Sequence, residues 1–140
     1  MITLDTNIVF YALAGADFSE QRKVDRAQVV LSEANFLSVQ VLNEYAASVR
    51  RKLRRDWAEI EHDTKLLRAT VSEICPIVSA TNFDALRLVK HYQLGFYDGL
   101  MLAVALAHHA ETFYSEDMQH GMVIDKKLTI INPFLEPDAL

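Results

Sequence analysis

The chain of 140 residues carries 14 basic and 19 acidic residues, which gives a formal net charge of −5. Hydrophobic residues make up 51% of it, which excludes a disordered chain. The longest apolar stretches fall well short of the about 20 residues that a membrane span needs. No basic and apolar leader of the signal-peptide type precedes the first strand, so we expect a cytoplasmic protein that makes no membrane contact. The length fits one domain over residues 1–140 with a sizeable core.

One basic run, residues 50–55, stands out from an otherwise acidic chain. Five of the fourteen Lys and Arg residues lie in it, which leaves nine basic residues against nineteen acidic ones, a balance of −10. One basic patch on an acidic body is compatible with local contact to phosphate groups.

Cysteine usage is minimal, since Cys75 is the one cysteine of the sequence. A single cysteine excludes an internal disulfide framework and a cysteine-based zinc site. Cys75 precedes Pro76 in an apolar segment, so we expect its thiol to lie in the core.

Short apolar runs alternate with segments of helical periodicity along the whole chain. The predicted strands are 2–4, 36–39, 76–78, 111–114 and 122–124, with a last edge strand or loop at 128–133. The predicted helices are 8–13, 19–34, 40–53, 57–74, 82 to about 92, and 95–107. This alternation predicts an α/β fold with a mainly parallel sheet, in which functional sites lie at the carboxyl ends of the strands.

The segment 95–107 is expected to be the central helix. Every residue from Leu100 to Ala107 is apolar, and a helix that is apolar all round is buried all round. We therefore expect the sheet on one side of it and a second layer, or another subunit, on the other. Its first turn carries one carboxylate, Asp98, which is either a functional group or a residue that complements the helix dipole.

Four acids occupy comparable places in this layout. Asp5 follows the first strand, Glu44 lies about one turn into the helix after the second strand, Asp98 opens the central helix, and Asp117 follows the penultimate strand. In a parallel sheet these carboxylates can converge on one edge, where mutual repulsion raises their pKa values unless a counter-charge is present. Mg²⁺ and Mn²⁺ prefer such oxygen ligands and support attack of water on a phosphodiester.

Each of these assignments has an alternative that the sequence leaves open. Asp5 is also a good helix cap, Glu44 is compatible with a surface position, and Asp117 lies in a turn that favours aspartate. Arg51 and Arg55 follow Glu44 at i+7 and i+11 and are either phosphate-binding residues on the same helix face or a solvated helix end.

The same residues resemble the four acidic blocks of the PIN domain. The blocks are a hydrophobic strand with Asp5-Thr6-Asn7, Glu44 within a helix, Tyr97-Asp98-Gly99 before an apolar helix, and Tyr114-Ser115-Glu116-Asp117-Met118. The chain length and the run Ser-Glu-Asp-Met-Gln-His-Gly resemble the VapC toxins of bacterial toxin–antitoxin pairs, and the similarity spans the whole chain.

This resemblance implies a three-layer α/β/α fold and a metal-dependent endoribonuclease. Asp5, Glu44, Asp98 and Asp117 are then expected to bind Mg²⁺ or Mn²⁺ and to be catalytic. Ser115 matches the position that orients a carboxylate or a water molecule, and Asn7 matches a position that supports the metal ligands. Glu116 is an additional acid grouped with Asn7 and Ser115 as a supporting residue, without a specified role, and Arg51 and Arg55 remain candidates for RNA binding.

The resemblance also implies partners. They are an RNA substrate, a VapB-like antitoxin that covers the site, and a second copy of the chain. The second copy would form a homodimer centred in or next to residues 96–107, with a higher assembly once the antitoxin binds.

The sequence offers no convincing nucleophile–base pair, which favours metal-activated water over covalent catalysis. The alternatives are a metal-dependent phosphohydrolase acting on a small nucleotide and a partner-binding module with a relic acidic site.

Overall fold

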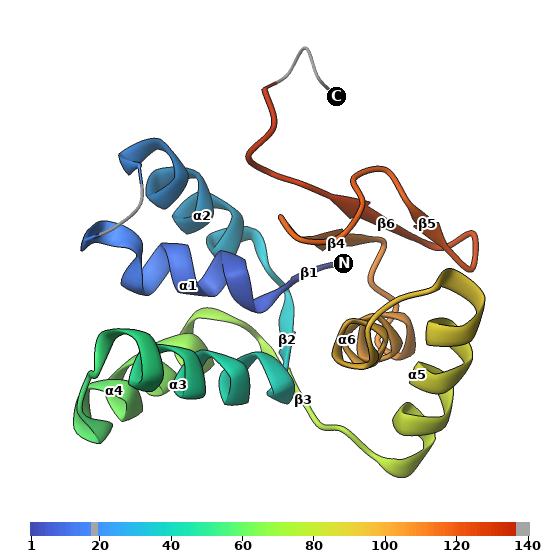
Figure 1. Cartoon of the computed structure of the whole chain (residues 1–140), viewed down its shortest axis with the longest axis horizontal. Helices are drawn as coiled ribbons and strands as arrows, with labels where there is room; N and C mark the ends of the chain where they lie inside the picture. The colour runs from blue at the N-terminus through green and yellow to red at the C-terminus, as the bar shows by residue number, and fades with distance from the viewer. Residues whose placement is uncertain (18–19, 137–140) are drawn as a thin grey trace.

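The computed structural model describes residues 1–17 and 20–136 (Figure 1). A four-stranded sheet has the spatial order β1 (Ile2–Leu4), β4 (Thr112–Tyr114), β6 (Leu128–Ile131) and β5 (Val123–Ile124). The first three strands are parallel, and β5 is antiparallel to β6. Strands β2 (Phe36–Ser38) and β3 (Glu73–Cys75) form a separate parallel pair.

The β2–β3 pair lies beside β1 and extends the sheet. The backbone N–H of Asn35 donates to the carbonyl of Ile2 at 2.8 Å, and the Ile2 N–H donates to Asn35 Oδ1 at 2.7 Å. The buried Thr3 hydroxyl donates to the Phe36 carbonyl at 2.7 Å. The prediction of an α/β fold with a mainly parallel sheet is therefore confirmed.

Helices cover both sides of this sheet (Figure 1). They are α1 (Thr6–Ala14), the short 3-10 helix η1 (Gly15–Asp17), α2 (Gln21–Glu33), α3 (Val39–Leu53), α4 (Trp57–Thr70), α5 (Ser79–Tyr92) and α6 (Phe96–Ala107). Helices α1 and α2 pack together on one side, with α3 against α1 and α4 against α3, whereas α5 and α6 pack together on the other side. The predicted start of the second helix, Ser19, lies outside the described residues.

The helix predicted for 57–74 begins at Trp57 as predicted but is shorter, and the strand predicted for 76–78 lies three residues earlier. Helix α4 ends at Thr70, and the strand occupies Glu73–Cys75. Pro76 has no N–H for a ladder hydrogen bond, which ends the strand. Val78 instead caps α5 and donates its N–H to Thr81 Oγ1 at 3.3 Å, so the fifth helix starts three residues earlier than predicted.

The last strand was expected at an edge or as a loop, and this is wrong. Strand β6 lies between β4 and β5 and pairs with both. Its alternating residues Leu128 and Ile130 are fully buried, which explains why an interior place suits it.

Helix α6 is buried along most of its length, as predicted. Gly99 to Ala105 are all buried, with β2 on one side and α5 on the other. Close approach of α5 depends on Gly99, where a Cβ atom would lie 2.6 Å from Val89 Cγ2 and 3.0 Å from the Ala85 carbonyl oxygen. The apolar surface of α6 therefore needs no second subunit to cover it. Across residues 1–17 and 20–136, no helix is both long enough and apolar enough to cross a membrane.

Candidate active site

Asp5 lies where β1 ends, with only 6% of its surface exposed. Its Oδ1 accepts from the Thr6 N–H at 2.7 Å, and its Oδ2 accepts from the Ser115 hydroxyl at 2.8 Å. Asp5 therefore does cap α1, and the same geometry fixes its carboxylate at the carboxyl edge of the sheet. Burial raises its pKa to about 6; the charges of Asp98 and Glu44 also raise it, whereas the two hydrogen bonds lower it.

Glu44 points from α3 toward the start of α1. Its Oε2 accepts from the Thr6 hydroxyl at 2.7 Å, and its Oε1 accepts from Gln40 Nε2 at 3.4 Å. The carboxylate is partly buried and held at both oxygens, so the alternative of a free surface residue is wrong. The sequence did not single out Thr6 for this contact, because only the fold brings α3 beside α1.

Asp98 lies in the first turn of α6 and is half-buried. Burial raises its pKa, and the negative charges of Asp117 and Glu44 raise it as well. The position of Asp98 in the first turn of α6 is also compatible with complementing the helix dipole. Asp98 interacts electrostatically with Asp117 and Glu44, and Asp5 with Asp98 and Glu44, so the four predicted acids lie near one another. Among the described residues, no three of these acids have their carboxylate oxygens all within 4.8 Å of one another.

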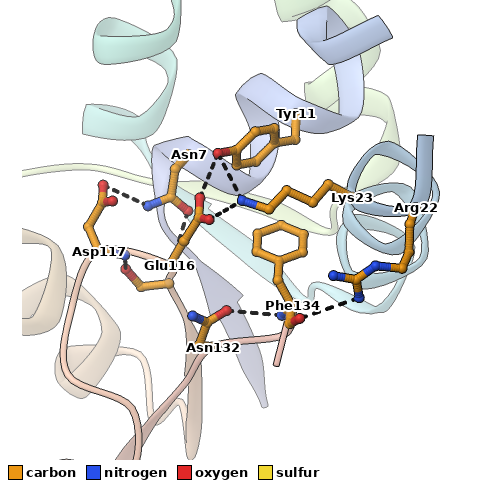
Figure 2. Close-up of polar contacts among 9 residues, drawn as sticks. Asn7, Tyr11, Arg22, Lys23, Glu116, Asp117, Asn132 and Phe134 are labelled. Carbon is orange, nitrogen blue, oxygen red and sulfur yellow. Dashed lines mark hydrogen bonds and ion pairs between the residues drawn. The ribbon is translucent and has the colours of Figure 1, made fainter. Parts of the chain in front are cut away.

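Asp117 completes this cluster from the turn after β4. Asn7 Nδ2 donates to Asp117 Oδ2 at 3.0 Å, as Figure 2 shows, and reaches Asp5 Oδ2 at 3.5 Å. The fully buried Ser115 hydroxyl accepts from the N–H groups of Asp117 and Met118, both at 3.2 Å. Asn7 and Ser115 thus hold the two acids that come from opposite ends of the sequence.

A groove of about 520 Å³ is lined by two of the four acids, Glu44 and Asp117, whereas Asp5 and Asp98 do not line it. The residues that line it are Thr6, Asn7, Phe10, Tyr11, Glu44, Ala47, Ser48, Arg51, Lys52, Glu116 and Asp117. One wall of the groove is lined by acidic side chains. The wall formed by α3 carries the exposed basic side chains of Arg51 and Lys52.

Arg55 does not line this groove, contrary to its predicted place on the face of Glu44 and Arg51. Helix α3 ends at Leu53, and Arg54 turns the chain away in the left-handed region, with φ of 54°. Arg55 instead pairs with Asp63 on α4, at 3.1 Å between Nη1 and Oδ2. The helical spacing from Glu44 does not place Arg55 on the same face, because the helix ends before Arg55.

Glu116, which was predicted only as a supporting acid, is held by two side chains that the sequence did not indicate (Figure 2). The Tyr11 hydroxyl donates to its Oε2 at 2.6 Å, and the Lys23 ammonium forms an ion pair with its Oε1. The Lys23 Nζ also lies 4.9 Å from the centre of the Tyr11 ring and 5.1 Å from that of Phe134. The hydrogen bond to Glu116 raises the pKa of Lys23, so Lys23 stays charged and neutralises this acid.

The other acids have no such compensation. Within the described ranges 1–17 and 20–136, none of Asp5, Glu44, Asp98 and Asp117 forms an ion pair. Four oxygen-donor side chains, two of them with raised pKa values, therefore share uncompensated negative charge. This donor set suits a hard divalent cation such as Mg²⁺ or Mn²⁺.

Comparison with known families agrees with this geometry, since the PIN domain model matches residues 2–121. The chain belongs to the PIN domain family. The match includes all four clustered acids of this PIN domain, together with Asn7, Ser115 and Glu116. A search of curated proteins found no matching relative.

Solved structures share the PIN fold of this chain. A toxin–antitoxin complex from Klebsiella pneumoniae contains a chain with a TM-score of 0.68 and 21% identity, covering 96% of this chain and 98% of that one. VapBC2 from Rickettsia felis, bound to a promoter DNA fragment, gives a TM-score of 0.64 at 18% identity, covering 93% and 97%. Mycobacterium tuberculosis VapC20, a sarcin-ricin loop cleaving toxin, gives 0.64 at 17% identity, covering 84% and 90%.

Proposed function

We propose that this PIN-domain protein is a metal-dependent endoribonuclease and the toxin of a toxin–antitoxin pair. The observation that carries the proposal is the cluster of four carboxylates without cationic partners beside a groove with a basic wall. The acids suit a divalent cation, and the basic wall suits the phosphates of a nucleic acid. The fold shared with toxin chains supports the biological role.

In this proposal Asp5, Glu44, Asp98 and Asp117 hold Mg²⁺ or Mn²⁺. A bound divalent cation lowers the pKa of water and stabilises negative charge on phosphate oxygens. The protein contributes carboxylates that are already oriented: Thr6 holds Asp5 through its N–H and Glu44 through its hydroxyl. Such preorganisation reduces the reorganisation that binding and reaction require.

Substrate binding is assigned to the α3 wall of the groove. Arg51 and Lys52 are exposed and face the groove, where they attract the RNA backbone toward the acids. Lys23 is excluded from this role because it is bound to Glu116, and Arg55 because it is bound to Asp63.

The antitoxin is proposed to occupy the same groove. Two of the solved relatives are described as a toxin–antitoxin complex and as VapBC2. An inhibitor that inserts a basic side chain among the uncompensated acids would both block RNA and replace the cation's charge.

Cleavage of RNA by the purified protein tests the activity. We expect cleavage with Mg²⁺ or Mn²⁺, its loss with a chelator and in Asp5→Asn, and products with 5′-phosphate and 3′-hydroxyl ends. Asp84→Asn is the matched control, because Asp84 pairs with Arg87 on α5. Products with 2′,3′-cyclic phosphate would refute the metal-dependent mechanism, and hydrolysis of mononucleotides without RNA cleavage would favour the small-nucleotide alternative.

Co-expression with the product of the neighbouring gene tests the partner. We expect that product to co-purify with the protein, restore growth and suppress RNA cleavage. If the neighbouring gene's product neither co-purifies, restores growth nor suppresses cleavage, the antitoxin part of the proposal fails. The nuclease part is tested separately by the cleavage assay.

A further inference from the structure

A second group of metal-binding side chains lies outside the acidic groove. A carboxylate oxygen of Glu73, the Sγ of Cys75 and a ring nitrogen of His108 all lie within 4.8 Å of one another. Glu73 and Cys75 are two residues apart on β3, so their side chains share one face of the strand. His108 is the residue at which α6 ends.

The fold brings these three residues together through β2. Phe36 of β2 pairs with Glu73 across the strands, and the Phe36 ring packs against the His108 ring at 5.5 Å between centres. Cys75 is fully buried, His108 is partly buried and Glu73 is exposed. The group therefore runs from the interior to the surface.

The donor atoms of the two outer residues are free. In the described part of the chain, no hydrogen bond or ion pair engages the side chain of Glu73 or of His108. The cluster also lies at the carboxyl end of α6, where the partial negative charge of the helix favours a cation. Neither the groove nor the proposed ribonuclease activity uses any of these residues.

We propose that Glu73, Cys75 and His108 form a Zn²⁺ site separate from the acidic groove. Thiolate, imidazole and carboxylate are the zinc ligands of proteins, and three protein ligands with one water make a common coordination set. Mg²⁺ and Mn²⁺ do not prefer sulfur, so the two sites differ in the metal they select. A single cysteine excludes zinc sites that are built from several cysteines. A site with mixed ligands needs only one cysteine.

Zinc binding requires a modest local contraction. Metal–ligand bonds of about 2.0–2.3 Å bring the ligand atoms of a tetrahedral site to roughly 3.5 Å from one another. The exposed Glu73 side chain is the group that moves most easily to close the remaining distance. Cys75 must also lose its proton, so binding of the ion releases one proton to solvent.

The two sites lie at opposite ends of one helix. Asp98 is in the first turn of α6 and His108 at its end, which separates them by about 15 Å along the axis. The zinc site is therefore measurable while the groove is disabled, and its test does not depend on ribonuclease activity.

Cobalt is the probe, because a thiolate bound to Co²⁺ gives a charge-transfer band in the near ultraviolet. Cys75 is the one cysteine of the sequence, so such a band reports on it alone. Using the full chain with Asp5→Asn and Asp98→Asn, we expect the band to saturate at one equivalent and to disappear when Zn²⁺ is added. His108→Gln and Glu73→Gln should weaken Co²⁺ binding at least tenfold, whereas His109→Gln, a neighbouring exposed histidine, should not.

Thermal unfolding provides a second measurement, since Cys75→Ser changes a core residue and can fail to fold. We expect Zn²⁺ to raise the unfolding temperature of the groove-disabled protein and to have no effect in its His108→Gln form. The proposal is overturned if no charge-transfer band forms, or if His108→Gln binds Co²⁺ and responds to Zn²⁺ like its parent.

Discussion

The Asp5 carboxylate combines two conditions that both disfavour its ionised form, namely deep burial and a position among other acids. Its folded-state pKa of about 6 exceeds the usual value near 4. Between about pH 4 and pH 6 the folded protein therefore binds more protons than the unfolded chain, so this group favours folding at low pH. Its contribution to stability is lost as the pH rises through 6.

We therefore expect Asp5→Asn to stabilise the metal-free protein at pH 7 by up to about 3 kcal/mol, the free-energy equivalent of this shift. The advantage should shrink as the pH is lowered from 6 to 4. Denaturant unfolding of both proteins in chelator across pH 4–8 measures the difference. A difference that does not vary with pH would mean that Asp5 has an ordinary pKa.

Asp98 tests whether the acids act as one cluster. Asp98→Asn keeps the size of the side chain and its place in α6 but removes its charge. We expect kcat/KM for RNA cleavage to fall at least about a hundredfold, the usual scale of a lost electrostatic contribution. The fold should be retained, because burial and neighbouring charges already disfavour the ionised form. Full activity would leave Asp98 as a helix-end residue only.

At the level of elements, the contact between α5 and α6 positions Asp98. Gly99→Ala would place a methyl group against Val89 and the Ala85 backbone, with no flexible side chain to give way. We expect a loss of about 1–3 kcal/mol in the free energy of unfolding and reduced activity, because the first turn of α6 must shift.

Gly95→Ala is the matched control for this substitution. A Cβ atom at Gly95 meets only Asp98 Oδ2 at 3.9 Å, an ordinary contact, and the backbone there has φ of −65°. This variant should keep both stability and activity. If Gly99→Ala behaved in the same way, the close packing of α5 on α6 would not be what positions Asp98.

The sequence predicted the helices, most strands and all four acids because each depends on local signals. Hydrophobic periodicity and the position of an acid after a strand can be read within a few residues. Other features depend on contacts that local patterns do not contain. Lys23 meets Glu116 from 93 residues away, and one left-handed residue, Arg54, redirects Arg55. Pro76, by contrast, is a local signal, because its missing N–H ends the strand that precedes it.

For the whole molecule, the resemblance predicts a homodimer centred in or next to residues 96–107, and the structure indicates which side chains there to test. Helix α6 is covered by α5, so the exposed apolar side chains beside it are the candidates. Phe83 on α5 is 73% exposed and Tyr97 at the start of α6 is 59% exposed. Exposed aromatic residues of this kind are typical of protein interfaces.

We expect the protein to sediment as a dimer at micromolar concentration and Phe83→Glu to make it monomeric without loss of fold. Trp57→Glu is the control, because Trp57 is 61% exposed but lies on α4, in the other helical layer. A monomeric parent protein would contradict the dimer, and dissociation by Trp57→Glu would move the interface to α4.

The order in which the chain is made has a consequence for the groove. Asp5 enters the polypeptide first, but the turn that carries Asp117 is fixed by a hydrogen bond of 2.9 Å from the Ser115 N–H to the Ile131 carbonyl. Translation at 5–20 residues per second separates the synthesis of these two ends by roughly 6–25 s. A chain that ends between Asp117 and Ile131 therefore carries all four acids and still lacks the hydrogen bond that fixes the turn of Asp117. Under the proposed function, the acidic groove is complete only after nearly the whole chain has been made, which leaves that interval for an inhibitor to be supplied.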